Sequence, residues 1–137
     1  MSETITIEEY RALQKAPQKY GNRKIEVDGV RFDSRKEANR YQELLLLEAG
    51  GAIEDLTPHP RYELQPAFRD ARGWKHPAIT YVADFSYLEI NDPSAVVGTL
   101  VVEDVKGGKG TQTEVFRIKA KLFRFRYPNI ELRIIEL

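Results

Sequence analysis

Two apolar runs in the second half of the chain each end in acidic residues, and this constrains the fold more than any other feature. The run 79–84 ends at Asp84, and the run 100–106 ends in Asp104-Val105-Lys106. Because strand residues i and i+2 project to the same side, Asp104 and Lys106 should face one way and Val105 the other. If the runs are neighbouring strands, two carboxylates and an amine converge at one sheet edge. That arrangement suits a divalent cation that activates water for attack on a phosphodiester.

The composition restricts the kind of metal site. The chain has no cysteine and two histidines, so disulfides, thiolate zinc sites and thiol nucleophiles are excluded. Any metal site must be built from oxygen, which favours Mg²⁺ or Mn²⁺. The length of 137 residues suits one domain. The longest apolar stretch, 44–47, is too short to span a membrane and the N-terminus lacks a signal-peptide pattern, so we expect a cytoplasmic protein without membrane contact.

The distribution of charge matters more than its sum. The formal net charge is zero, which weakens a purely electrostatic case for nucleic-acid binding. However, the segment 106–126 carries seven basic residues and one acidic residue, and the segment 15–40 carries eight basic and four acidic residues. These two segments are either nucleic-acid contacts or ordinary solvated faces.

The first half of the chain predicts a hairpin followed by a helix. Alternating residues flank Asp28-Gly29, a pair that accepts the positive φ angles of a type I′ turn. A helix is expected from about Ser34 to Ala49, ended by the Gly50-Gly51 pair. Its predicted apolar stripe consists of Ala38, Tyr41, Leu44, Leu45 and Ala49.

The second half predicts strands, a helix and a last strand. Three strands are expected over 61–69, 77–90 and 98–105, joined by short turns into an antiparallel meander. A helix over 114–127 should bury a face made of Val115, Ile118, Leu122 and Phe125. A final strand over 130–137 should lie parallel to the third strand through the helical crossover. Residues 1–18 are expected to form a loosely attached segment, and residues 19–137 a single domain.

The element order and four short strings resemble the PD-(D/E)XK nuclease superfamily, in a phage-associated branch similar to small Holliday-junction resolvases. The strings are Lys19-Tyr20-Gly21-Asn22, the segment 32–38 around Glu37, the segment 81–85 around Asp84, and the segment 102–107 around Asp104 and Lys106. The resemblance covers about residues 19–137. It implies an α/β fold of the α+β type: a restriction-endonuclease-like αβββαβ core whose central mixed sheet is flanked by helices, here with an added N-terminal β-hairpin.

The same resemblance implies a function. A member of this superfamily would be a Mg²⁺- or Mn²⁺-dependent DNA endonuclease acting on branched, junction or duplex DNA in phage recombination or replication. A homodimer would place two active sites on two strands. If the protein is phage-encoded, it would work in the host cytoplasm.

The resemblance assigns roles to three of the residues above. Asp84 would be the metal-bridging aspartate, although Ala83 stands where the family has proline. Asp104 takes the second acidic position, and Lys106 takes the lysine position, near the scissile phosphate. Other readings are open: Asp84 can cap a backbone amide at a turn, and Asp104 with Lys106 can be a surface ion pair.

Glu37 has two interpretations. Ser34-Arg35-Lys36-Glu37 is a capping box, which alone explains an acid at this position. Glu37 also lies on the stripe that carries Tyr41 and Leu44, where a buried carboxylate needs a cation, and resolvase-like proteins have an acid here. We therefore favour Glu37 as a metal ligand. Glu103 competes with Asp104 but is out of phase with Lys106, so it should face the other side of the sheet.

Several polar side chains are candidates for DNA contacts. Lys119 is expected near the buried face of its helix, and Gln65 lies in the first predicted strand. The remaining candidates are a loop lysine and three outward-facing helix residues: Lys109, Arg117, Lys121 and Arg124. Surface polarity explains these residues equally well. Two other functions stay open, a non-catalytic DNA- or protein-binding module on a nuclease-like fold, and sequence-specific cleavage of a restriction or repair kind.

Overall fold

The computed structural model describes residues 24–92, 94, 97–107 and 112–137, with the backbone alone for Val97. The predicted segment 1–18, the string 19–22 and Lys109 lie outside the described residues. The helices are α2 (Arg35–Ala49) and α3 (Glu114–Arg126). The strands are β1 (Ile25–Val27), β2 (Val30–Phe32), β3 (Ile53–Pro58), β4 (Arg61–Gln65), β5 (Phe68–Arg69), β6 (Lys75–His76), β7 (Ile79–Val82), β8 (Phe85–Asp92), β9 (Val97–Lys106) and β10 (Glu131–Glu136).

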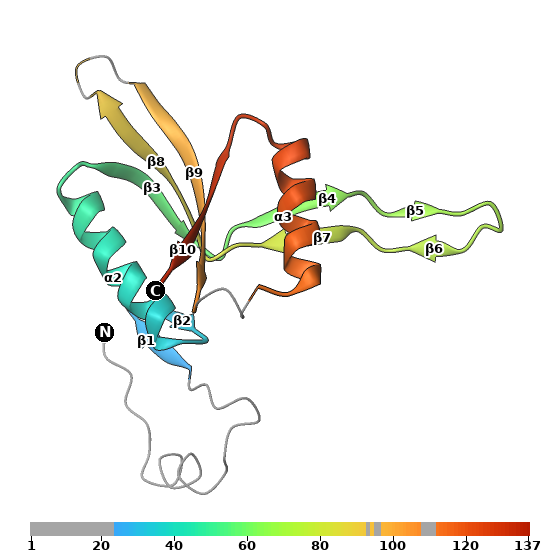
Figure 1. Cartoon of the computed structure of the whole chain (residues 1–137), viewed down its shortest axis with the longest axis horizontal. Coiled ribbons are helices and arrows are strands. Elements are labelled where there is room, and N and C mark those ends of the chain that lie inside the picture. Colours follow the sequence, from blue (N-terminus) through green and yellow to red (C-terminus); the bar gives the residue numbers. More distant parts are fainter. Residues whose placement is uncertain (1–23, 93, 95–96, 108–111) are drawn as a thin grey trace, which may run out of the picture.

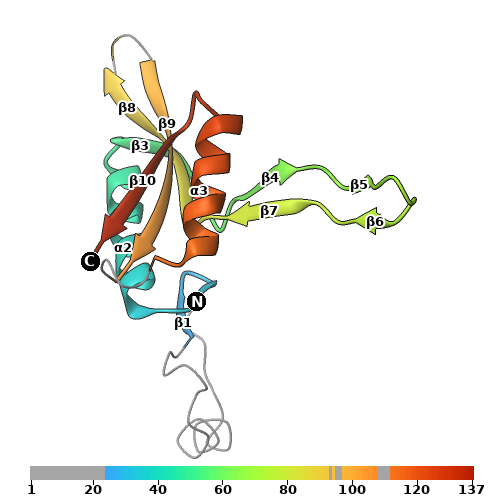
Figure 2. The ribbon, with the colours of Figure 1, turned by 45° about the vertical axis from the view of Figure 1, so that its right-hand side comes forward.

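A mixed four-stranded sheet forms the centre of this α+β molecule. Its strand order is β10-β9-β8-β3, in which β9 pairs parallel with β10 and antiparallel with β8, and β3 pairs antiparallel with β8. The two helices cover opposite faces of the sheet (Figures 1 and 2). The parallel pairing of β9 and β10 through α3 is confirmed, because a helical crossover returns the chain in the same direction.

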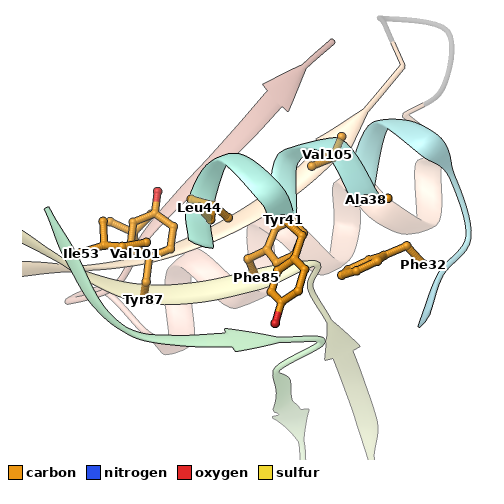
Figure 3. Close-up of a cluster of buried hydrophobic side chains, with 9 residues drawn as sticks. All are labelled: Phe32, Ala38, Tyr41, Leu44, Ile53, Phe85, Tyr87, Val101 and Val105. Atoms are coloured by element: carbon orange, nitrogen blue, oxygen red, sulfur yellow. The ribbon is translucent and has the colours of Figure 1, made fainter. Parts of the chain in front are cut away.

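Strand β9 divides its side chains between two cores. Val101 and Val105 pack on the α2 side with the aromatic rings of Phe32, Tyr41 and Phe85 (Figure 3). Val102 packs on the α3 side with a second cluster, whose members are Leu64, Tyr81, Ala83, Ala120, Phe123 and Leu132. Because successive residues of a strand point to opposite faces, this alternation also decides which charged residues of β9 meet which helix.

The hairpin and the first helix form as predicted. Asp28 and Gly29 have φ angles of 48° and 81°, as the tight turn between β1 and β2 requires. Ser34 caps α2, because its Oγ accepts a hydrogen bond from the Glu37 amide, at 3.2 Å. Gly50 ends the helix. Within the predicted stripe, Ala38, Tyr41 and Leu44 are buried and Leu45 is half-buried, whereas Ala49 is exposed.

The prediction of a three-strand meander is wrong for its first strand. The outer strand of the central sheet is β3, a segment with no predicted strand, and the run 61–69 instead forms β4 and β5. Strand β3 was hidden because it is a polar edge strand, with a register shift between Glu54 and Thr57 and a positive φ of 56° at Asp55. The run 77–90 is also broken at Ala83-Asp84, which separates β7 from β8.

The segment between β3 and β8 forms a long two-stranded arm. Strand β4 pairs with β7, and β5 pairs with β6 further out, so the arm extends away from the sheet (Figures 1 and 2). Its outer turn is held by Asp70, whose Oδ1 accepts hydrogen bonds from the amides of Arg72 and Trp74. Trp74 lies in this turn and is 69% exposed to solvent.

The predicted buried face of α3 is wrong. All four residues of that face are exposed: Val115 by 62%, Ile118 by 59%, Leu122 by 39% and Phe125 by 87%. The helix instead buries Ala120 and Phe123. Aromatic packing explains this choice, since Phe123 meets Tyr62, Tyr81 and Tyr127 at ring-centroid distances of 5.0–5.6 Å.

Candidate active site

The two aspartates lie side by side where the central sheet meets the arm. Phe85 pairs with Glu103 across β8 and β9, which places Asp84 beside Asp104. The Asp84 amide donates to the Glu103 carbonyl at 3.1 Å. The Val105 amide donates to Asp84 Oδ2 at 2.6 Å. The predicted turn-type capping by Asp84 therefore exists, and it fixes this carboxylate against the β9 backbone.

Asp104 is buried and holds two side-chain partners. Tyr81 donates its hydroxyl to Asp104 Oδ2 at 2.6 Å, and Lys106 donates from Nζ to Asp104 Oδ1 at 2.5 Å. The Lys106 ammonium also lies 4.0 Å from the centre of the Phe116 ring, a cation–π contact. The predicted pairing of Asp104 with Lys106 is present, but both side chains are largely shielded from water, so the surface ion-pair reading does not describe it.

Glu37 reaches this cluster from the first turn of α2. Its Oε2 accepts a hydrogen bond from Ser34 Oγ at 2.9 Å, and its carboxylate is hydrogen-bonded to the Asp84 carboxyl. Two carboxyl groups can share a hydrogen bond only if one holds a proton. Glu37 is therefore part of the helix cap, as one of its two interpretations predicted, and it also lies beside Asp84.

Burial and neighbouring acids change the protonation of this cluster. Burial raises the pKa of Asp84 to about 9, with further contributions from the hydrogen bond to Glu37 and the charge of Asp104. Burial and the adjacent Asp104 carboxylate likewise raise the pKa of Tyr81 well above its usual range. Burial and the neighbouring acids thus favour the protonated form of Asp84 at neutral pH.

The donor set of this cluster fits a hard cation in its chemistry. Glu37, Asp84 and Asp104 present carboxylate oxygens only, which suits Mg²⁺ or Mn²⁺. Within the part of the chain that the structure describes, no group of three acidic, histidine or cysteine side chains has the spacing of a preformed metal site. A cation bound by these carboxylates would relieve the crowding of acids that contributes to the raised pKa of Asp84.

Comparison with known protein families places the chain. The family described as "Protein of unknown function (DUF1064)" matches residues 17–136. The chain belongs to this family. No curated protein and no solved structure matches it. The DUF1064 match includes every residue of the carboxylate cluster.

The DUF1064 protein spreads the predicted DNA contacts over one helix and the arm. Arg117, Lys121 and Arg124 are exposed on α3 as predicted, and Lys119 is half-buried. Gln65 is exposed on β4, beside an open groove that it shares with Leu122, Phe125 and Arg126. Phe116, which touches Lys106, is nine residues from Phe125, or about 13 Å along the helix. On the arm, Gln65 pairs with Ile79, two residues before Tyr81, the arm residue that contacts Asp104.

Sequence reasoning missed three groups of the site: the Tyr81 hydroxyl, the Phe116 ring and the Val105 amide. Tyr81 stands in the run that ends at Asp84, but its contact with Asp104 depends on a strand arrangement that the sequence did not reveal. The prediction for Glu103 is confirmed, because it faces α2 and is paired with Arg40. Among the described residues of this DUF1064 protein, neither helix has the length and apolar character needed to cross a lipid bilayer.

Replacing Asp84 with asparagine is expected to stabilise the DUF1064 protein at neutral and alkaline pH. The folded protein keeps a proton on Asp84 up to about pH 9, whereas the unfolded chain releases it near the ordinary value of 3.8. The unfolded state binds fewer protons between these values, so the free energy of unfolding falls as the pH rises through this window and levels off above it. Asparagine removes this loss and should add roughly 1–3 kcal/mol at pH 8.

Urea unfolding of wild-type protein and Asp84→Asn at pH 5, 7 and 9, with a chelator present, measures this effect. The stability difference between the two proteins should grow with pH. The exposed Glu54→Gln variant serves as the control, and its difference from wild type should stay constant. A difference for Asp84→Asn that does not change between pH 5 and 9 would show that Asp84 is ionised in the folded protein.

Proposed function

We propose that this protein is a Mg²⁺- or Mn²⁺-dependent DNA endonuclease that hydrolyses phosphodiester bonds in branched or junction DNA. The convergence of Asp84, Asp104 and Lys106 at one place, with Glu37 joining from α2, is the observation that carries the proposal. The fold is compatible with it. The order α2-β3-β8-β9-α3-β10, with the arm inserted between the first two strands, supports the αβββαβ core that the resemblance implies.

In this proposal Glu37, Asp84 and Asp104 hold the cation. When bound, the cation supplies an activated water and neutralises charge on the phosphate. Lys106 is held beside Asp104 by the carboxylate and by the Phe116 ring, so its ammonium is fixed in direction. From there it can orient the attacking water and offset the negative charge that develops on the scissile phosphate. Tyr81 fixes the rotation of the Asp104 carboxylate through its 2.6 Å hydrogen bond.

The exposed basic residues of α3 support a nucleic-acid substrate. Arg117, Lys121 and Arg124 are solvent-exposed on the helix whose first turns carry Phe116, the ring that contacts Lys106. Phosphate groups along a DNA strand can therefore be held next to the carboxylate cluster. Branched DNA as the substrate, and a place in phage recombination or replication, remain part of the proposal through the resemblance. Cutting both strands would take a second copy of the chain.

A cleavage panel tests the reaction and its substrate together. The purified protein is incubated with single-stranded, linear duplex, flap and four-way DNA in Mg²⁺, in Mn²⁺ and in chelator. We expect metal-dependent nicking that is fastest on the four-way or flap substrate. Faster cleavage of linear duplex at fixed sequences would favour a restriction or repair role instead. No cleavage of any substrate in either metal would reject the endonuclease proposal.

A non-catalytic DNA- or protein-binding module is the second candidate. The neutral net charge favours it, and so does the hydrogen bond between Glu37 and Asp84, because these two carboxyl groups then already have a partner without a cation. Calorimetric titration with Mn²⁺ separates the two candidates. An endonuclease should bind Mn²⁺ with heat that disappears in Asp84→Asn, whereas a module without a cation site should give no heat that depends on Asp84.

A further inference from the structure

An unpartnered apolar stripe runs along the outer face of α3. It consists of Val115, Ile118, Leu122 and Phe125, hereafter the α3 stripe, and the end residue Phe125 is 87% exposed. Exposed apolar surface of this kind marks a contact with a protein, a membrane or a ligand. The stripe continues into a groove of about 510 Å³ between α3 and β4, lined by Leu64, Gln65, Pro66, Leu122, Phe125 and Arg126.

The charged residues around the α3 stripe indicate what kind of surface can bind to it. Five basic residues belong to the helix, Arg117, Lys119, Lys121, Arg124 and Arg126, against the single acid Glu114. A symmetric contact of one α3 stripe with another would bring like charges together, which opposes association. The matching surface should instead combine exposed apolar side chains with carboxylates.

Such a surface exists on the same molecule, at the end of α2 and the start of β3. Leu46 and Leu47 are 75% and 41% exposed there. Between Arg40 and Arg61 the sequence has four acids, Glu43, Glu48, Glu54 and Asp55, and neither lysine nor arginine. All four acids are solvent-exposed. We call this surface, with its two leucines, the α2 patch.

The carboxylates of the α2 patch keep their negative charge available. Glu48 accepts a hydrogen bond from the Leu56 amide at 3.0 Å, which places it beside β3. Glu43 pairs with Arg40, but the same guanidinium is bound by both oxygens of the buried Glu103. The charge of Arg40 is therefore already balanced by Glu103, and Glu43 adds net negative charge to the patch.

We propose that a second copy of this chain docks its α2 patch on the α3 stripe, in a head-to-tail contact. Leu46 projects from the patch and suits the groove between α3 and β4, while the acids of the patch meet Arg126, the basic residue that lines this groove. Because α2 and α3 cover opposite faces of the sheet, each copy can use both surfaces at once (Figure 2). Contacts of this type build open chains or rings rather than a closed two-fold dimer.

The size of the two surfaces predicts a weak contact that depends on salt. A stable interface buries roughly 800 Å² on each partner. Two leucines on one side supply only part of this area, so association should require high protein concentration. Exposed charge pairs contribute to it, and salt should weaken it because salt screens them.

Sedimentation velocity of the full chain at rising concentration, without DNA or metal, tests the contact. We expect a weight-average mass that rises beyond that of a dimer. The rise should be weaker in 0.5 M salt, because the screening length there is only somewhat longer than the value of about 3 Å at 1 M. Leu46→Asp and Phe125→Asp each remove one of the two surfaces at a solvent-exposed position. The association of each variant alone should therefore be weakened at least tenfold, so that each stays monomeric at the concentrations where the wild type associates.

The mixture of the two variants is the decisive sample. Leu46→Asp keeps its α3 stripe and Phe125→Asp keeps its α2 patch, so an equimolar mixture has one complementary contact and should form dimers and nothing larger. Trp74→Asp, an equally exposed apolar position on the arm, is the control and should associate like wild type. A mixture that stays monomeric, a Leu46→Asp protein that associates like wild type, or a wild-type chain that is monomeric throughout would overturn the proposal. None of these outcomes depends on whether the protein cleaves DNA.

Discussion

Asp104→Ala is expected to lower the rate of junction cleavage by about a thousandfold. The substitution removes a carboxylate that holds Lys106 at 2.5 Å and Tyr81 at 2.6 Å, so the proposed cation loses a ligand and the ammonium loses its fixed direction. The measurement is the single-turnover cleavage rate of four-way DNA in Mg²⁺, with enzyme in excess.

Two comparisons make this result interpretable. Leaving the Tyr81 hydroxyl and Lys106 without their partner should cost about 1–3 kcal/mol of stability, so circular dichroism and a thermal melt must show that the variant is folded. Glu54→Ala removes a carboxylate from the exposed surface of β3 and should cleave at the wild-type rate. If folded Asp104→Ala also cleaves at that rate, the active site is elsewhere.

Arg40→Met is expected to give the largest loss of stability, about 3–5 kcal/mol. Glu103 is fully buried in the core, and Arg40 donates to its two oxygens at 2.8 and 2.7 Å, while Tyr87 donates its hydroxyl to the same carboxylate. Methionine keeps the packing of the arginine stem but leaves the carboxylate without its cation. A loss of this size is a large part of the total stability of an ordinary domain.

Urea unfolding checks this expectation against two further variants. The double variant Arg40→Met, Glu103→Gln removes the buried charge with its partner and should recover most of the lost stability. Glu43→Ala breaks the other contact of Arg40, an exposed pair, and should change stability by about 1 kcal/mol or less. A loss below 1 kcal/mol in Arg40→Met would mean that the Arg40–Glu103 pair does not stabilise the folded protein.

Local patterns in the sequence predicted the elements that local physics determines. The Asp28-Gly29 turn, the Ser34 cap and the Gly50 end of α2 depend on residues close in the chain, and all three are present. The opposite directions of Glu103 and Asp104 follow from strand alternation alone, and they were predicted for the same reason.

The errors arose where distant parts of the chain decide the outcome. The α3 stripe has the spacing of a buried helix face, yet the aromatic residues Tyr62, Tyr81 and Tyr127 select the face that carries Phe123. Strand β3 lacks an apolar alternation because it is an edge strand. In the candidate site, Tyr81 meets Asp104 from 23 residues away in the chain, and no pattern in either segment indicates this contact.

The position of the arm within the chain has a consequence for how this family can vary. Strands β3 and β8 are adjacent in the central sheet, so the polypeptide leaves and re-enters the body of the molecule at nearly one point (Figure 1). Lengthening or trimming the outer strands β5 and β6 would leave that junction intact, since loop extensions between closely spaced ends are well tolerated. The outer end of the arm can therefore change without disturbing the site. The inner end cannot, because Tyr81 in β7 belongs to the carboxylate cluster.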